Sequence, residues 1–135
     1  MKLAFYKASG NLIDKAIRLV TLGKYSHCEL IFSDGQWFSA DAWENKCRFK
    51  DGSKFNLQNW DFIDFNCDEQ LAKLFCKNIE GAKYDFRAIL LWLIPMSIDN
   101  SKKWYCSEVC NSAIAFPHEK ISPSSLYKKI VNINT

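Results

Sequence analysis

The chain contains little histidine and no apolar segment long enough to cross a bilayer. Only two of its 135 residues are histidines, His27 and His118. The longest apolar run, AILLWLIPM at residues 88–96, is about half of the roughly 20 residues that a membrane-spanning helix needs. It therefore predicts a buried helix and no transmembrane segment. The first ten residues also lack an apolar core of signal-peptide length, so we expect synthesis in the cytoplasm.

Runs of basic residues, internal repeats and low-complexity segments are also missing. The net charge is +3, and the lysines are scattered except for the pairs Lys102-Lys103 and Lys128-Lys129. No basic stripe of the kind that binds nucleic acid is present. Hydrophobic residues make up 48% of the chain, which is typical of a globular protein. The sequence predicts a single domain over residues 1–135.

The six cysteines do not fit a compact disulfide framework. They are Cys28, Cys47, Cys67, Cys76, Cys106 and Cys110. Most lie in apolar or strand-like segments, where a free cysteine behaves as a small hydrophobe. We therefore expect reduced thiols, in agreement with a cytoplasmic site of synthesis.

The pattern of apolar residues predicts an α+β fold. Strands are expected over residues 2–6, in a hairpin of residues 26–32 and 36–42 around Asp34-Gly35, and within residues 55–65. Helices are expected over residues 11–23, 68–81, 83–95 and from residue 106, with a short final element at 126–133.

Two of the predicted helices have defined apolar faces and ends. In the first, the residues Ile13, Ile17 and Val20 share a face, with Ser9 or Asn11 as the N-cap and Gly23 beyond the end. In the second, the apolar face consists of Leu71, Leu74, Phe75 and Ile79, and Gly81 closes the helix.

The segment WYCSEVC, residues 104–110, places a cysteine at the start of an apolar stretch that stops at Pro117. The first turn of a helix lowers a thiol pKa, because its unpaired N–H groups favour the thiolate. Cys106 is therefore the candidate nucleophile, whereas Cys110 is expected to pack in the core. Glu108, in the same turn, either stabilises the helix N-terminus or contacts a substrate amine.

His27 is the candidate base for this thiol. Strand alternation puts His27, Glu29 and Ile31 on one face of an otherwise apolar strand. Cys28 alternates to the opposite face and is expected to point away from the site. His118 follows Pro117 in a polar loop, where we expect a solvated side chain.

The hairpin register decides which residue faces His27. A turn over Ser33, Asp34 and Gly35 places His27 opposite Asp41 and Glu29 opposite Ser39. A two-residue Asp34-Gly35 turn shifts the register by one and moves Asp41 to the other face. In the first register Asp41 could accept a hydrogen bond from the imidazole and fix its tautomer, with Ser39 and Glu29 as alternatives.

The segments KYSHCELIF, GAKYDF and KKWYCSEVC together resemble the circularly permuted branch of the NlpC-type papain-like cysteine peptidases, which includes the YiiX-like proteins and lecithin:retinol acyltransferase. The likeness is strongest for small bacteriophage-encoded and bacterial members and covers residues 3–127. It implies a permuted papain-like fold in which a cysteine helix packs against an antiparallel sheet. Cys106 would then be the nucleophile and His27 the base, without a cofactor. A third polar residue on the next strand, frequently acidic in relatives, would be Asp41, with Ser39 or Glu44 as alternatives.

The chemistry that these residues predict is acyl transfer through a thioester on Cys106. The backbone N–H of Cys106 is a natural oxyanion donor, and Tyr84 is the candidate for a second. The resemblance implies a peptide or amide substrate such as cell-wall peptide. The alternative is a lipid acyltransferase or acylhydrolase, in which residues 88–96 with Trp43, Trp92 and Trp104 line an acyl groove instead of the core.

Three further interpretations belong to other classes. A metal site would use His27, Glu29, Cys106 and Cys110, but these lack a compact ligand spacing, and we expect no bound metal. A redox pair of Cys106 and Cys110 would have three residues between the thiols, where redox pairs have two. The third is a binding module that keeps the fold without catalysis.

Overall fold

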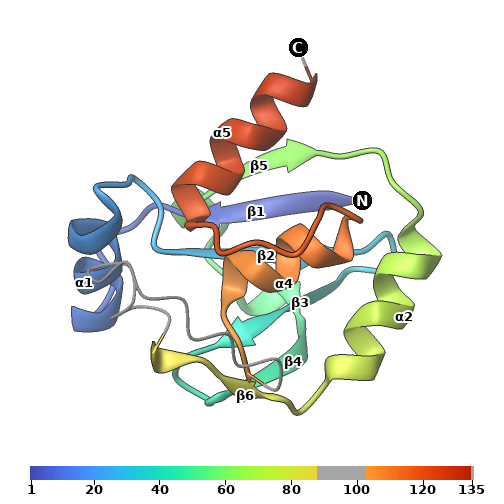
Figure 1. Ribbon diagram of the computed structural model, residues 1–135, viewed down its shortest axis with the longest axis horizontal. Coiled ribbons are helices and arrows are strands. Elements are labelled where there is room, and N and C mark those ends of the chain that lie inside the picture. The colour runs from blue at the N-terminus through green and yellow to red at the C-terminus, as the bar shows by residue number, and fades with distance from the viewer. Residues whose placement is uncertain (88–102, 135) are drawn as a thin grey trace.

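The computed structural model describes residues 1–87 and 103–134, and its centre is a five-stranded antiparallel sheet (Figure 1). The strand order is β4-β3-β2-β1-β5. The strands are β1 (Lys2–Tyr6), β2 (His27–Ile31), β3 (Gln36–Asp41), β4 (Lys46–Asp51) and β5 (Trp60–Asp64). The α+β class and the strands expected at 2–6, in the hairpin and within 55–65 are confirmed. β2 is the central strand of the sheet, so Cys28, Glu29 and Leu30 are buried.

The hairpin of β2 and β3 adopts the first of the two registers. Leu30 lies opposite Phe38 and Ile31 opposite Trp37, and the Phe32 N–H donates to the Gln36 carbonyl at 2.9 Å. The turn therefore spans Ser33 to Gly35, and Gly35 has a φ of +85°, which glycine adopts without strain. The two-residue turn is wrong.

Strand β4 was not predicted from the sequence. A turn with Asn45 in the left-handed conformation, φ 53°, joins it to β3. Its apolar residues Cys47 and Phe49 alternate with Arg48 and Lys50, which is a short strand pattern. The strand brings Arg48 opposite Ser39 across the sheet.

The helices agree in part with the predicted patterns. Helix α1 (Leu12–Thr21) is capped by Asn11, not Ser9, and Gly23 lies past its end. Helix α2 (Glu69–Ile79) follows the N-cap Asp68, and only part of its predicted apolar face is buried. Phe75 and Ile79 pack against the main core as expected, but Leu71 and Leu74 are 64% and 55% exposed, because the face that α2 turns to α4 is centred on the buried Ala72 and Cys76.

The C-terminal part contributes α4 (Cys106–Ala113) and α5 (Pro123–Asn134). Helix α5 begins three residues before the predicted element, since proline suits the first helical position and the Ser122 hydroxyl accepts the Ser125 N–H at 3.1 Å. Between α2 and α4, the short strands β6 (Lys83–Tyr84) and β7 (Lys103–Trp104) pair in parallel. The helix predicted over 83–95 is wrong at its start, where Lys83 and Tyr84 form β6, and its residues from 88 on lie outside the described residues.

The two faces of the sheet bury different kinds of residue. Helix α4 packs against β2 and β3 and is contacted by α2 and α5, so this face, the helix-packed face, carries the main core (Figure 1). Its members include Leu3, Phe5, Cys28, Leu30 and Val109. The opposite face, the pocket face, has a smaller cluster of Ala4, Trp37 and Trp60. No helix in the described ranges is long and apolar enough to span a membrane.

Candidate active site

Cys106 is the first residue of helix α4 and is buried, with 2% of its surface exposed. The preceding residue, Tyr105, is extended and acts as the N-cap, so the Cys106 thiol lies at the positive end of the helix dipole. The side chain of Cys106 hydrogen-bonds to Cys28 and to His27. The Cys28 hydrogen bond and the His27 imidazole hold the pKa of Cys106 well below 9.0, although burial acts in the opposite direction.

His27 lies at the start of β2 and contacts Cys106 and Glu29. Its Nε2 atom is 3.1 Å from Oε1 of Glu29. Burial alone would lower the pKa of His27, but the Cys106 thiolate and the Glu29 carboxylate raise it well above 6.5. The opposite pKa shifts of the thiol and the imidazole favour a thiolate–imidazolium ion pair at neutral pH.

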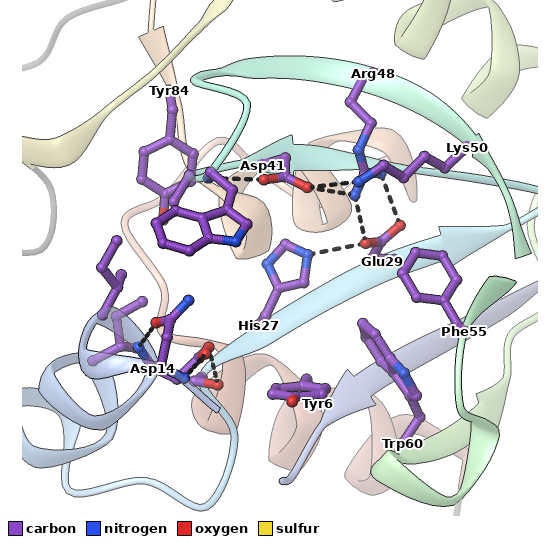
Figure 2. Close-up of a pocket in the computed structure, with 16 residues that line it drawn as sticks. Tyr6, Asp14, His27, Glu29, Asp41, Arg48, Lys50, Phe55, Trp60 and Tyr84 are labelled. Carbon is purple, nitrogen blue, oxygen red and sulfur yellow. Dashed lines mark hydrogen bonds and ion pairs between the residues drawn. The ribbon is translucent and has the colours of Figure 1, made fainter. Parts of the chain in front are cut away.

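Glu29 is held in turn by Arg48. Two guanidinium nitrogens of Arg48 donate to the two carboxylate oxygens of Glu29 at 3.1 and 3.0 Å, the bidentate geometry that makes such pairs strong. Burial would raise the pKa of Glu29, but His27 and Arg48 lower it. Glu29 therefore stays ionised although it is only 1% exposed. Figure 2 shows Glu29 between His27 and Arg48, with dashed lines that link it to both.

Asp41 is linked to the His27 imidazole only indirectly, because it binds Arg48, which also binds Glu29. The expected hydrogen bond from His27 to Asp41 is not found among the described contacts, and Glu29 occupies that role. The Asp41 carboxylate accepts from Arg48 at 2.7 Å and from the backbone N–H groups of Trp43 and Glu44. These partners lie in the β3–β4 turn and on β4, and they hold the shorter aspartate side chain away from His27. Glu44 pairs with Lys50 at 2.7 Å.

Cys28 does not point away from the site, so that prediction is wrong. Alternation does place Cys28 on the helix-packed face, but the N-terminus of α4 lies against that face. Since His27 is the first residue of β2, Cys106 contacts both the histidine at the strand end and the cysteine beside it. Ser39 is buried and donates to the Cys28 carbonyl at 2.7 Å, so it supports the strand and does not line the pocket.

Tyr84 is buried close to Cys106 and lines the pocket. Burial, followed by the Cys106 thiolate, raises the pKa of Tyr84 well above 10.0, so its hydroxyl keeps a proton to donate.

Glu108 faces a different histidine. Its Oε1 lies 2.6 Å from Nε2 of His118, and its Oε2 accepts the Tyr105 N–H at 3.4 Å. The second contact supports the helix N-terminus, one of its two expected roles. His118 is half exposed, at 49%, and it is paired with Glu108, a contact that the sequence did not reveal.

A cavity of about 240 Å³ opens on the pocket face beside His27 (Figure 2). Its lining combines charged residues with aromatic rings: Tyr6, Asp14, His27, Glu29, Asp41, Trp43, Arg48, Lys50, Phe55, Trp60 and Tyr84 are among them. Cys106 is not among the described lining residues. Trp43 is 79% exposed, whereas Trp104 packs edge-on against Phe75. Trp92 and residues 88–96 lie outside the described residues.

Arg48 is the site residue that sequence analysis missed. The available signal was the alternation in NKCRFKD after a turn, which places Arg48 and Lys50 on one strand face. Nothing local indicated that this face is shared with Glu29.

Within residues 1–87 and 103–134, no three histidine, cysteine, aspartate or glutamate side chains are grouped so that they could hold a metal ion. The chain was also compared with known proteins. It matches no protein-family model and no curated protein sequence.

Proposed function

We propose that this protein is a thiol-dependent acyl-transfer hydrolase, a cysteine peptidase or amidase with a permuted papain-like arrangement. The observation that carries the proposal is Cys106 at the N-terminus of α4, hydrogen-bonded to His27, with their pKa values moved in opposite directions. A buried cysteine that only packs has its pKa raised, as burial raises the pKa of Cys47 to about 12. The pKa of Cys106 is therefore lowered, whereas the pKa of Cys47, a cysteine that only packs, is raised.

In the proposed reaction the Cys106 thiolate attacks the substrate carbonyl carbon and forms a C–S bond. The carbonyl oxygen becomes an oxyanion, for which the Cys106 N–H and the Tyr84 hydroxyl are donors, each typically worth on the order of 3 kcal/mol in the barrier. The His27 imidazolium gives its proton to the leaving nitrogen as the C–N bond breaks. Neutral His27 then takes a proton from water, the resulting hydroxide attacks the thioester, and the thiolate leaves.

Glu29 orients the imidazole, as the third member of a triad does. With Nε2 bound to Glu29, the other ring nitrogen is the one available to Cys106. In this assignment Glu29 has the role that was predicted for Asp41.

The substrate follows from the resemblance, which favours a peptide or amide bond such as that of cell-wall peptide. Lipid acyl transfer is the second candidate, favoured by one observation: Trp43, 79% exposed, lines the pocket beside His27. A protein that binds one of these ligands without cleaving it is the non-catalytic alternative.

The test is cysteine labelling joined to an activity assay. Iodoacetamide at about pH 6, read by peptide mass spectrometry, should modify Cys106 far faster than Cys47 or Cys67. Cell-wall peptide fragments and a fatty-acyl ester should be offered in parallel to the wild type and to Cys106→Ser. We expect cleavage of the peptide by the wild type only, with an almost unchanged melting temperature in the variant. Equal labelling of Cys106 and Cys47, with equal processing by both proteins, would favour the binding module.

A further inference from the structure

We propose that Cys106 and Cys28 form a reversible disulfide when a peroxide reaches the site, with Cys106 as the residue that is oxidised first and Cys28 as the resolving thiol. The oxidant is hydrogen peroxide or a small alkyl hydroperoxide. The consequence, a reversible loss of hydrolysis, rests on the proposed function, whereas the formation of the disulfide does not.

The fold brings the two thiols together from distant parts of the chain. Cys28 lies on the central strand β2 and alternates to the helix-packed face, and Cys106 begins α4, which packs against that strand. Both belong to the main core, with 0% and 2% of their surface exposed. The side chain of Cys28 hydrogen-bonds to that of Cys106. The two sulfurs are therefore neighbours, which is the first condition for a disulfide.

The two thiols differ in charge, and this difference assigns their roles. Oxidation by peroxide follows the thiolate character of a cysteine. The Cys28 hydrogen bond and the His27 imidazole lower the pKa of Cys106 well below 9.0. Burial, followed by the hydrogen bonds to Cys106 and Cys110, raises the pKa of Cys28 well above 9.0. Cys106 is therefore the thiol that is oxidised, and Cys28 remains protonated beside it.

The cavity on the pocket face leads a small peroxide toward Cys106. His27 and Tyr84 line the cavity, and both lie close to the Cys106 sulfur. The carbonyl carbon of the proposed substrate must reach the same sulfur, which is a larger demand than the entry of a peroxide. Cys28 is fully buried and is not among the described lining residues. The peroxide therefore meets Cys106 before it meets Cys28.

In the first step the Cys106 thiolate attacks one oxygen of hydrogen peroxide. An S–O bond forms as the O–O bond breaks, which gives a sulfenic acid, and the departing hydroxide takes the proton of the His27 imidazolium to form water. In the second step the Cys28 sulfur attacks the Cys106 sulfur. The S–S bond forms as the S–O bond breaks, and the departing hydroxide takes the Cys28 proton to form a second water. The two sulfurs together lose two electrons, which the peroxide gains.

Cys110 is the third thiol of this cluster and provides the matched control. It is as fully buried as Cys28, and Cys28 hydrogen-bonds to it as well. The hydrogen bonds described for Cys106 are those to Cys28 and His27, not to Cys110. Cys110 also lies one turn further along the same helix as Cys106. We therefore expect Cys28, and not Cys110, to resolve the sulfenic acid.

The experiment treats the full chain with hydrogen peroxide at neutral pH and maps the products by peptide mass spectrometry without reduction. A parallel sample contains dimedone, which traps sulfenic acids. In the wild type we expect a cross-linked peptide pair that joins Cys28 to Cys106, with little dimedone adduct. Dithiothreitol should then restore both the iodoacetamide labelling of Cys106 and any hydrolytic activity.

Cys28→Ala removes the resolving thiol. Cys106 should then carry the dimedone adduct, and without dimedone it should proceed to sulfinic acid, which dithiothreitol does not reduce. The fraction of Cys106 that dithiothreitol restores should fall on the order of tenfold, because the oxidation no longer stops at a disulfide. The variants are compared at equal extents of Cys106 oxidation, since loss of the Cys28 hydrogen bond also slows the first step. Cys110→Ala should give the same cross-link and the same recovery as the wild type.

The outcomes separate this inference from the proposed function. If wild-type Cys106 is oxidised to sulfinic acid with no cross-link, the resolving role of Cys28 is overturned while the hydrolase stands. This outcome needs no variant, so it is decisive even if Cys28→Ala folds poorly. A cross-link from Cys106 to Cys110 would also overturn the inference. If the Cys28–Cys106 cross-link forms in a protein that cleaves neither cell-wall peptide nor a fatty-acyl ester, the proposed function is overturned and the modification site stands.

Discussion

The protein has two histidine–glutamate pairs, one on β2 and one that includes Glu108 of α4. They differ in the further partners of the carboxylate. His27 contacts Glu29 at 3.1 Å and His118 contacts Glu108 at 2.6 Å, so distance alone would rank the second pair higher. Glu29 also binds Arg48, and the pKa of Glu29 is lowered. No arginine or lysine is among the described ion-pair partners of Glu108, and burial raises its pKa.

The difference shows what a buried carboxylate needs in order to stay charged beside an imidazole. One histidine does not offset the loss of hydration, whereas a histidine and a bidentate arginine together do. The His27–Glu29 pair, although its contact is longer, is therefore the one suited to hold an imidazolium next to a thiolate. The predictions below test this contrast.

The largest effect is expected from Arg48→Met. Removing the guanidinium leaves Glu29 and Asp41 buried without their main cation, and breaking such a group typically costs about 3–5 kcal/mol in the free energy of unfolding. His118→Gln, which breaks the partly exposed pair, should cost no more than about 1 kcal/mol. Urea denaturation of both variants gives the comparison, and equal losses would contradict it. The double variant Arg48→Met/Glu29→Gln should recover part of the loss.

The next largest effect concerns the reactivity of Cys106. Without the imidazolium, the pKa of Cys106 moves back toward the free thiol value of about 8.5, at which only about 0.3% is thiolate at pH 6. His27→Ala should therefore slow iodoacetamide labelling of Cys106 on the order of 100-fold at that pH. His118→Ala is the matched control and should change the rate by less than about twofold. A comparable loss in both variants would remove the distinction between the two histidines.

The pH dependence of stability sharpens the contrast, because only His27 faces a thiolate. Between its lowered folded pKa and its unfolded value of about 8.5, Cys106 is charged in the folded protein and protonated in the unfolded chain. The unfolded chain then binds one more proton, so the free energy of unfolding rises with pH by at most about 1.4 kcal/mol per unit. Above about 6.5 the unfolded chain has lost the His27 proton that the folded protein keeps, and the two contributions cancel.

We therefore expect the stability of the wild type, measured relative to Cys106→Ser, to rise with pH up to about 8.5, because the His27 contribution is common to both proteins and drops out of the difference. Glu29 keeps His27 protonated in both proteins, and the titration of Glu108 is common to both. Urea denaturation at intervals of half a pH unit provides the measurement. A flat difference curve throughout would mean that the thiol is not ionised in the folded state.

The smallest effect is expected from Cys28→Ala. The Cys28 thiol is the first contributor to the lowered pKa of Cys106, and one hydrogen bond of this kind is typically worth about 1 kcal/mol. Labelling of Cys106 at pH 6 should slow by about fivefold. Cys76→Ala removes another buried thiol, on α2, and should leave the rate unchanged. An unchanged rate in Cys28→Ala as well would assign the whole pKa shift to His27 and the helix N-terminus.

The sequence predicted the parts of this molecule that depend on local pattern. Alternation predicted β1 and β2, the Asp-Gly turn predicted the hairpin, and of the two N-cap candidates Ser9 and Asn11 the second begins α1. Cys106 at the first position of α4 was predicted in the same way, from an apolar stretch and its first turn. These features need only neighbours within a few residues.

The rest depends on contacts that the chain pattern does not encode. That Glu29 and not Asp41 meets His27 follows from side-chain length and from the partners that already hold Asp41. That Cys28 contacts Cys106 follows from where α4 lies on the sheet, which strand alternation cannot give. The role of Arg48 could not be predicted, because the alternation pattern of β4 is short and weak. The partners of Arg48 also lie on two other strands.

The positions of β2 and α4 in the chain set an order of events during synthesis. Ribosomes make His27, Glu29 and Arg48 early, and all three belong to strands that pair with their neighbours in sequence. Cys106 emerges much later, on a helix that must dock against a sheet whose strands have already been made. The nascent chain thus contains His27 and its ion-pair partners before it contains the Cys106 thiol. The proposed nucleophile gains its imidazole partner only when α4 docks, so the Cys106 thiol keeps an ordinary pKa until that step.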